Sequence, residues 1–396
     1  MSRELLLEEK YILDLLKVSV SNTASFDKRE FIKAGIDVDR VIEISQAHMI
    51  TALMYTALER AYLPVKLIGK IEDEAKNVVS KNYRLLFLSR AIQKALENHG
   101  IENAVIKGSA TASLYDVPEY RKSGDVDILI LDDKKLDEAC DVIKELGLDC
   151  NDVQRALHHV AFSMEEGIDV ELHSMLAEPF DNKEINDYLF ALTKECTLEK
   201  ISIFEMEITA LTTAYNAFEL LLHMLQHFLR AGFGLKLLCD WVVFWNRDIE
   251  ENEKEKYLKL VTESKIKGFS DIVTKTCIEY LGLNPQKVSF MELENIDISN
   301  FIVDIFDAEE FGHSSNDRMV GMRGASLSDF VREFHHQTCL NYPKASKMII
   351  TFPVLWVCTL TKFMINNRRI RNVSVGEVLK SARTRGQLIN ELHLFE

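Results

Sequence analysis

Two carboxylates lie one residue apart in the sequence GDVDILI, residues 124–130. A short run of aliphatic and β-branched residues predicts a strand, and side chains alternate between the two faces of a strand. Asp125 and Asp127 therefore point the same way, while Val126 and Ile128 point into a core. Two neighbouring carboxylates repel each other unless a cation neutralises them, and oxygen ligands of this kind suit Mg²⁺. We expect the metal site of the protein at this strand.

A second alternating segment, residues 167–173 with the sequence GIDVELH, supplies a third acid. Its apolar residues at positions 168, 170 and 172 share one face, so Glu171 and His173 lie on the other face. If this strand lies beside the strand of Asp125 and Asp127 with its polar face turned the same way, Glu171 reaches the same metal. His173 would then face either a nucleotide or a structural hydrogen-bond partner.

A Gly-Ser turn, Gly108-Ser109, follows an apolar run and precedes the acid pair. Three acids on two neighbouring strands beside such a turn suggest phosphoryl or nucleotidyl transfer assisted by metal ions. The Asp-Val-Asp strand alone could be a solvated sheet edge, but the turn and Glu171 make that alternative the weaker one. Because Gly108 and Gly124 are isolated glycines, no common Gly-rich phosphate loop is present, which argues against a kinase-like phosphotransferase.

The spacing of apolar residues divides the chain into three parts, which we expect to pack into one body. The predicted domains are an N-terminal helical segment (1–80), a core (81–200) and a mostly α-helical C-terminal region (201–396). Within the core we expect helices at 81–98, 110–115 and 134–146 and strands at 103–107, 125–130, 161–164 and 168–173. This order predicts the α+β class, with a small mixed β-sheet. Strand signals nearly vanish after about residue 210, where 211–229 and 235–245 read as buried helices.

At the turn and the acids the chain resembles the DNA polymerase β-type nucleotidyltransferase superfamily. It resembles most closely the uncharacterised nucleotidyltransferase family 5, whose members are mostly bacterial. The narrower likeness rests on Arg121 ahead of the acid pair, on His173 two residues after the third acid, and on a helical C-terminal part. That part contains Tyr342-Pro343 and an apolar stretch with Pro353 and Trp356. The superfamily motifs span only residues 105–173.

The resemblance implies a nucleotidyltransferase fold and a role for each motif residue. Gly108 and Ser109 would hold the β- and γ-phosphates of a nucleoside triphosphate. Asp125 and Asp127 would ligate the metal ions, and Glu171 would bind the catalytic Mg²⁺ and help to deprotonate an acceptor hydroxyl. Many family members have Ala at the position of Ser109 and Asp at the position of Glu171.

Three further residues are candidates for nucleotide binding, each with an alternative role. Lys107 can meet phosphate oxygens or pair with a nearby acid. Arg121, just before the acid strand, favours triphosphate or acceptor binding. His173 can contact the nucleotide or make a structural hydrogen bond.

The sequence therefore predicts Mg²⁺-dependent transfer of a nucleoside monophosphate from a nucleoside triphosphate to a hydroxyl of a small molecule or a protein. The helical C-terminal part would form the other wall of the cleft. The alternative hypothesis is a non-catalytic protein that keeps the fold and binds a nucleotide or a regulatory partner. Retention of Asp125, Asp127 and Glu171 weighs against that reading, because a metal-independent surface does not need three acids on one face.

The charge and the cysteine content limit the possible binding partners and the cellular compartment. The net charge of −15 argues against a nucleic-acid polymer as partner, since phosphate backbones are bound by basic surfaces. For the local basic clusters at 368–371 and 380–385, a solvated helix face is favoured over a phosphate or anion contact. Seven scattered cysteines without a Cys-x-x-Cys pair suggest reduced thiols in the cytoplasm. The apolar stretch 348–365 is too short for a membrane span and is expected to be a buried helix or helix pair.

The remaining histidines and aromatic residues have competing interpretations. His223 and His227, four apart on a helix, could pack in the core, contact substrate or phosphate, or bind a metal, in decreasing order of preference. The doublets at 158–159 and 335–336 have no ligand partner at the usual sequence spacing, so ordinary surface or packing roles are expected. Helical spacing predicts core packing rather than base stacking for the following aromatic residues: Phe228, Phe233, Trp241, Phe244 and Trp245.

Overall fold

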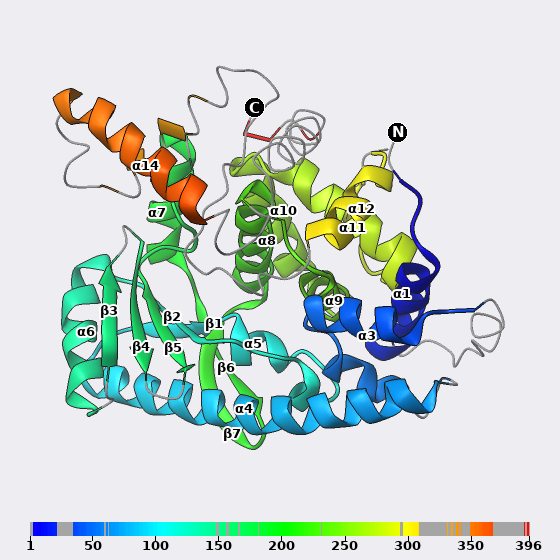
Figure 1. Cartoon of the computed structure of the whole chain (residues 1–396). Helices are drawn as coiled ribbons and strands as arrows, with labels where there is room; N and C mark the ends of the chain where they lie inside the picture. The colour runs from blue at the N-terminus through cyan, green and yellow to red at the C-terminus, as the bar shows by residue number, and fades with distance from the viewer. Residues whose placement is uncertain are drawn as a thin grey trace.

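The computed structural model describes the following residues: 3–21, 35–58, 61, 63–147, 150–155, 158–164, 167–180, 182–230, 232–293, 296–308, 331, 334–335, 338–339, 342, 349–366, 392 and 394–395. The basic clusters at 368–371 and 380–385, together with Pro343 and His336, lie outside the described residues. The described part is α+β, as the sequence predicts, with many helices around one mixed sheet (Figure 1).

The sheet has seven strands in the order β3-β4-β5-β2-β1-β7-β6. Their bounds are β1 Asn103–Ile106, β2 Val126–Ile130, β3 Cys150–Arg155, β4 His159–Met164, β5 Asp169–His173, β6 Leu198–Ile203 and β7 Met206–Leu211. β2 pairs with β5 and β1 with β7 in parallel, whereas the other neighbours are antiparallel. The mixed sheet that the sequence predicts is therefore confirmed, with the acid strand β2 near its middle.

One face of the sheet is covered by two helices, α4 (Val65–Asn98) and α6 (Leu136–Glu145). Val126 and Ile128 of β2 share a buried cluster with Leu85 of α4 and Ile143 of α6. Figure 1 shows α4 running along the whole underside of the sheet. The apolar residues of β2 therefore point into a core, as expected, and the acids face the opposite side.

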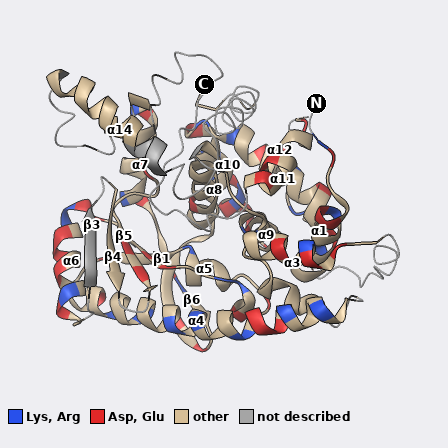
Figure 2. Cartoon of the chain, viewed as in Figure 1, with Lys and Arg blue, Asp and Glu red and all other residues tan. Residues whose placement is uncertain are grey.

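The helix expected at 81–98 begins earlier, at Val65 after Pro64. Leu67 and Ile71 on the added turns are buried, so the apolar stripe that defines the helix runs its full length. The predicted boundary between 80 and 81 falls inside this helix. Residues of both charges are spread along this helix, as the blue and red segments of Figure 2 show, which is typical of a helix with a solvated face.

The hairpin of β6 and β7 was missing from the sequence prediction. β7 pairs with β1 through Val105 and Ala210, and β6 covers the outer edge of β7. The predicted boundary between 200 and 201 consequently falls inside β6. The apolar alternation in β6 is broken by exposed residues at 199 and 200, and this weakens the strand signal in the sequence.

The acid-bearing face of the sheet looks toward a body of helices built from both ends of the described chain. The helices are α1 Leu7–Val20, α3 Val38–Ala47, α7 Lys183–Glu195, α8 Thr213–Arg230, α9 Leu235–Trp245, α10 Glu251–Glu263, α11 Lys267–Leu281 and α12 Ser299–Ala308. Shorter helical turns are η1 Ala52–Ala57, α5 Gly108–Ala112, η2 Pro118–Tyr120, η3 Asp133–Lys135, η5 Ser289–Met291 and η7 Ile349–Thr351. α1 packs on α9 and α11, so the N-terminal helix belongs to the same body.

The predicted aromatic core is confirmed. Phe228, Phe233, Trp241, Phe244 and Trp245 are all at most 1% exposed. They share one buried cluster with Ile106 and Leu129 of the sheet. This cluster joins the sheet to the helical body.

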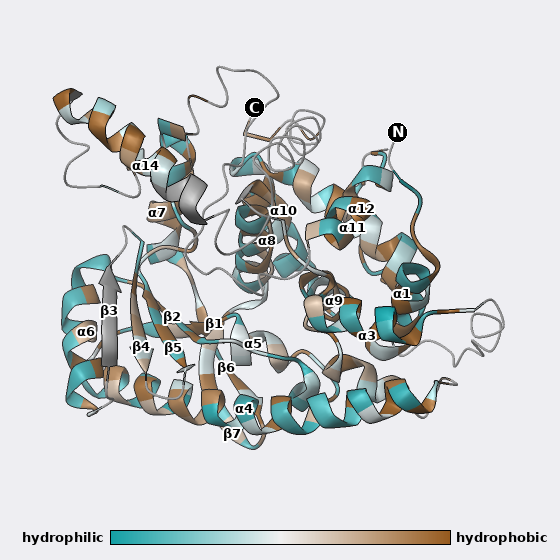
Figure 3. Cartoon of the chain, in the orientation of Figure 1, coloured by the Kyte–Doolittle hydropathy of each residue, from teal (hydrophilic) through white to brown (hydrophobic). Residues whose placement is uncertain are grey.

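The apolar stretch around Trp356 forms α14, Phe352–Asn366. The expectation that it is buried is wrong for most of its described side chains, because Val354 is 65% exposed and Val357 is 64% exposed. Among its described side chains, Leu355 and Thr359 are buried. Figure 3 shows the apolar colouring of this helix where it projects beside α7. None of the described helices is both long enough and apolar enough to cross a lipid bilayer.

A buried histidine links the N-terminal and C-terminal helices and gives the fold a pH dependence. The backbone N–H of Leu235 donates to His48 Nδ1 over 3.3 Å, and burial lowers the pKa of His48 to about 4. Because the unfolded pKa is about 6.5, the unfolded chain binds more protons below that pH and stability falls as the pH is lowered. We predict that the free energy of unfolding decreases by about 2 kcal/mol more between pH 7 and 5 in the parent than in His48→Gln.

Urea unfolding at the two pH values measures this difference. His99→Gln is the matched control, because the side chain of His99 is 46% exposed. An equal pH dependence in the parent and His48→Gln would contradict the prediction.

Candidate active site

Asp127 lies at the centre of the site, where two parallel strands meet. It is aligned with Glu171 of β5 in the register of the sheet, so both acids stand on the same face. Asp127 Oδ1 lies 2.8 Å from His173 Nε2 and 3.3 Å from Lys107 Nζ, and His173 Nε2 is 3.3 Å from Glu171 Oε2. The structure therefore brings together the two strands as the sequence predicts. It also places Lys107 and His173 in direct contact with the acids.

The turn before α5 holds Lys107 and Gly108 in unusual backbone conformations. Lys107 has φ 52° and Gly108 has φ 33°, a region that L-residues other than Asn, Asp and Gly rarely adopt. A Cβ at position 108 would contact the carbonyl oxygen of Asp125 at 3.4 Å. The turn thus lies directly against the start of β2, and its strain is typical of functional sites.

The charges of the cluster strongly affect one another. Burial alone would raise the pKa of Asp127, but the charge of Lys107 and the hydrogen bond with His173 outweigh it, so this pKa lies below its usual range. Burial and Lys107 act to lower the pKa of His173, yet hydrogen bonds with Asp127 and Glu171 raise it to about 9. Lys107 has a raised pKa because four carboxylates outweigh its burial.

Asp125 is the acid least favoured as an anion. Burial raises its pKa to about 7, with further contributions from the charges of Asp127 and Glu171. Negative groups therefore exceed positive ones in this cluster, and a bound cation would favour the ionised form of Asp125. Donor atoms of Asp127, Glu171 and His173 lie within 4.8 Å of one another, a spacing that fits one divalent ion.

Arg121 is fixed by the helical body. Its Nε and Nη2 donate to Asp240 Oδ1 and Oδ2 over 3.0 and 2.7 Å, and Arg121 is 4% exposed. Its Nη1 donates to the Gly108 carbonyl over 3.4 Å and to Ser123 Oγ over 3.1 Å. The guanidinium thereby connects α9, the Gly108 turn and the loop before β2. These contacts support a positioning role for Arg121 better than a direct contact with phosphate.

Two buried polar residues that the sequence analysis did not single out help to hold this loop. Asn82 of α4 donates to the carbonyl oxygens of Glu119 and Arg121, both over 2.8 Å, and accepts from the Ser123 N–H. Asp240 accepts a further hydrogen bond from the Tyr115 hydroxyl over 2.7 Å. Asp240 could have been identified from the sequence, because it is a charged residue within the apolar run of α9. A charged residue in a buried helix requires a partner.

The helix α8 presents a polar row toward the acids. Glu219 is 1% exposed, its Oε1 has no hydrogen-bond partner among the described residues, and burial raises its pKa to about 7. One and two turns further, the rings of His223 and His227 are 4.3 Å apart, and burial lowers both pKa values. Charges of Lys107 and Lys236 also act on both histidines. The two metal-capable groups found among the described residues do not include them.

The doublet at 158–159, for which surface or packing roles were expected, lies beside His173 in the sheet. His159 of β4 is aligned with His173 of β5, and His158 lies immediately before the strand. Ligand atoms of the three histidines lie within 4.8 Å of one another. Strand pairing creates this proximity, so sequence spacing alone did not reveal it. In the second doublet, His335 Nε2 lies 3.8 Å from Cys339 Sγ.

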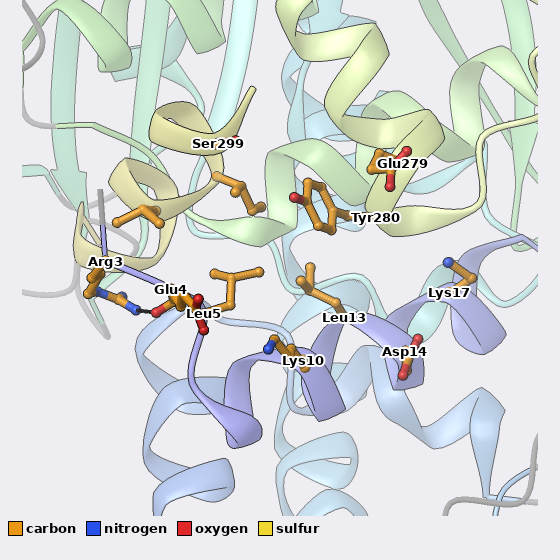
Figure 4. A pocket seen from close by; sticks show the side chains of 12 residues that line it. Arg3, Glu4, Leu5, Lys10, Leu13, Asp14, Lys17, Glu279, Tyr280 and Ser299 are labelled. Carbon is orange, nitrogen blue, oxygen red and sulfur yellow. Dashed lines mark hydrogen bonds between the residues drawn. The ribbon is translucent and has the colours of Figure 1, made fainter. Parts of the chain in front are cut away.

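A separate hollow of about 530 Å³ lies between α1 and the helices α11 and α12. Figure 4 shows Lys10, Asp14 and Lys17 of α1 facing Tyr280 and Glu279 of α11. None of the residues that line it belongs to the acid cluster. We therefore assign the candidate chemistry to the sheet and not to this hollow.

Comparison with known proteins agrees with the geometry. The model of a family described as uncharacterised nucleotidyltransferases matches residues 34–282. The chain belongs to this family. No curated protein matches the chain by sequence.

One solved structure is similar, that of an antigenic nucleotidyltransferase-like protein from Paracoccidioides brasiliensis. The two chains are 15% identical, the likeness covers 50% of this chain and 92% of the other, and the TM-score is 0.30. A likeness of this size supports no conclusion about activity.

The pair of Arg121 and Asp240 provides a test of how the site is held. Removing one partner leaves a buried charge without its counterion, so Asp240→Asn should lower the free energy of unfolding by about 3–5 kcal/mol. In Arg121→Met/Asp240→Leu both charges are gone, and the loss should be smaller than the sum of the losses in Arg121→Met and in Asp240→Leu. Denaturant unfolding of the single and double variants measures this coupling.

The exposed pair of Arg40 and Glu43 is the matched control, with side chains 51% and 64% exposed. Glu43→Gln should change stability by no more than about 1 kcal/mol. Additive losses for Arg121 and Asp240 would show that the pair does not act as a unit.

Proposed function

We propose that this protein transfers a nucleoside monophosphate from a nucleoside triphosphate to an acceptor hydroxyl, with Mg²⁺. The observation that carries the proposal is the alignment of Asp127 with Glu171 beside the turn of Gly108. Oxygen atoms from two strands converge there, with an excess of negative charge that suits a hard divalent ion. Membership of the nucleotidyltransferase family supports the same reaction class.

Each residue of the cluster has a defined place in this proposal. Gly108 and Ser109 would bind the β- and γ-phosphates through backbone N–H groups and the Ser109 hydroxyl. Lys107 would neutralise phosphate charge as well as that of Asp127, which it contacts in the structure. Asp125, Asp127 and Glu171 would hold Mg²⁺, and His173 orients Asp127 and Glu171 through its hydrogen bonds.

In the chemical step the acceptor oxygen attacks the α-phosphorus. The new phosphorus–oxygen bond forms as the bond to the β-phosphate oxygen breaks, and pyrophosphate leaves with that electron pair. The hydroxyl proton passes to the Glu171 carboxylate, whose side chain is 28% exposed and can return the proton to solvent. When bound, Mg²⁺ supplies charge neutralisation for the triphosphate and the departing pyrophosphate.

The helices α8 and α9 form the acceptor side of the site in this proposal. Glu219 has a buried oxygen without a hydrogen-bond partner among the described residues, which is the kind of group that an acceptor hydroxyl can satisfy. His223 and His227 extend the same helix row. An acceptor rich in hydroxyl groups, either a small molecule or a protein side chain, fits this wall better than a nucleic-acid polymer.

We place the reaction in the cytoplasm. Cys196 and Cys277 are buried free thiols, which suits a reducing compartment. The net charge of −15 also disfavours a polyanionic partner.

Calorimetric titration with a non-hydrolysable nucleoside triphosphate tests the proposal. The parent should bind in the presence of Mg²⁺ and lose most of that affinity without it. Asp125→Asn/Asp127→Asn should weaken binding at least about tenfold, equivalent to ~1.4 kcal/mol. Asp141→Asn on α6 is the matched control, because its side chain is 69% exposed. The control should bind as the parent does.

Asp125→Asn alone separates loss of function from loss of folding. It removes a repelling charge beside Asp127, so its free energy of unfolding without metal should rise by about 1 kcal/mol while nucleotide binding falls. No Mg²⁺-dependent binding by the folded parent would overturn the proposal. It would favour the non-catalytic interaction protein, whose function the acid substitutions would leave intact.

A further inference from the structure

We propose that His158, His159 and His173 form a second cation site, next to the carboxylate site, which takes a transition-metal ion such as Zn²⁺. The site is independent of the proposed nucleotidyl transfer, since it needs neither the triphosphate nor Asp125. It shares only His173 with the carboxylate group of Asp127 and Glu171.

The three imidazoles each place a ligand nitrogen within 4.8 Å of the others. His159 Nδ1 lies 2.7 Å from His158 Nε2. The ring centroids are 4.3 Å apart for His158 and His159, 5.6 Å for His159 and His173, and 6.2 Å for His158 and His173. Zinc–nitrogen bonds of about 2.0–2.1 Å in tetrahedral geometry put ligand nitrogens about 3.3 Å apart. An ion bound by the three rings would therefore replace the hydrogen bond between His158 and His159.

The fold fixes these residues before any ion binds. His159 and His173 are cross-strand partners in β4 and β5, and the Ser174 N–H donates to the His158 carbonyl over 2.8 Å. His158 is 7% exposed and His173 is 6% exposed. Ligands held by strand pairing lose little freedom on binding, which favours a specific site.

The contacts of His173 also suit a carboxylate that lies outside the set of metal ligands. Nε2 makes the contacts with Asp127 and Glu171, so Nδ1 is the nitrogen that can serve as a ligand. A metal-binding histidine commonly donates its other ring N–H to a carboxylate, which fixes the ring and raises its basicity. Asp127 occupies that place here. The carboxylate cluster thus supports the histidine site instead of competing with it.

The donor set determines the kind of ion. Imidazole nitrogen suits Zn²⁺, Cu²⁺, Ni²⁺ and Fe²⁺, whereas Mg²⁺ prefers carboxylate, carbonyl and water oxygen. Three histidines leave at least one position for water or a substrate oxygen, as in zinc sites with three protein ligands. The protein would then hold two chemically different ions side by side, each selected by its own ligands.

Zinc titration of the chelator-treated full chain tests this site without nucleotide. Isothermal calorimetry should show that the parent binds one equivalent of Zn²⁺. His159→Gln and His158→Gln should each lower the affinity at least about tenfold, because loss of a residue that only supports a ligand already costs that much. His99→Gln, at an exposed histidine, and Asp141→Asn, at an exposed acid of α6, should bind Zn²⁺ nearly as the parent does. Melting curves recorded without metal check that each variant is folded.

X-ray absorption of the zinc-loaded parent keeps the proposal testable if a histidine variant fails to fold. Three imidazoles around zinc would support it. Unchanged zinc binding in folded His158→Gln and His159→Gln would overturn it, as would thiolate or all-oxygen coordination. A larger loss in Glu171→Gln than in His159→Gln would place the ion on the carboxylates and would also overturn it. Failure of nucleotide binding alone leaves these outcomes unaffected.

Discussion

The contact of one buried carboxylate with two cationic side chains is the constraint on which the site depends. Asp127 is 3% exposed, and its Oδ1 contacts both Lys107 and His173. A buried carboxylate is costly unless it is paired and hydrogen-bonded, so neither partner can be moved freely. Lys107 reaches Asp127 from a turn with positive φ, and His173 reaches it from the neighbouring strand. The sheet register, the turn and the excess negative charge are therefore parts of one arrangement.

The helical body takes part in this arrangement and is more than a cover. Asp240 of α9 binds Arg121 with both carboxylate oxygens, and Arg121 in turn contacts the carbonyl of Gly108. The acid pair on β2 is thus connected to α9 through side chains that are nearly inaccessible to solvent. Glu219 of α8 adds a fourth carboxylate close enough to affect Lys107. In the proposed reaction, a site divided in this way between sheet and helices would offer one wall to the triphosphate and another to the acceptor.

Local patterns in the sequence were sufficient to predict which side chains of the two strands share a face of the sheet. Strict alternation in residues 124–130 and 167–173 determines which side chains share a face. Asp127 and Glu171 lie on the same face of the sheet, as the alternation predicts for neighbouring strands. Properties that depend on distant pairing were not accessible. The partner of Arg121 lies 119 residues away, and the approach of His159 to His173 requires the antiparallel register of β4 and β5. The hairpin of β6 and β7 was hidden for a related reason, because its pairing with β1 stabilises strands with weak alternation.

The central proposal is that Asp125, Asp127 and Glu171 would hold a divalent ion in a site that also binds a nucleoside triphosphate. Anomalous scattering from Mn²⁺ in crystals grown with a non-hydrolysable nucleoside triphosphate tests it most directly, because the ion and the phosphates are located together. The account predicts an anomalous peak among Asp125, Asp127 and Glu171, with the triphosphate against Gly108 and Ser109. A triphosphate bound elsewhere, or crystals with nucleotide but no ion at these three acids, would contradict it.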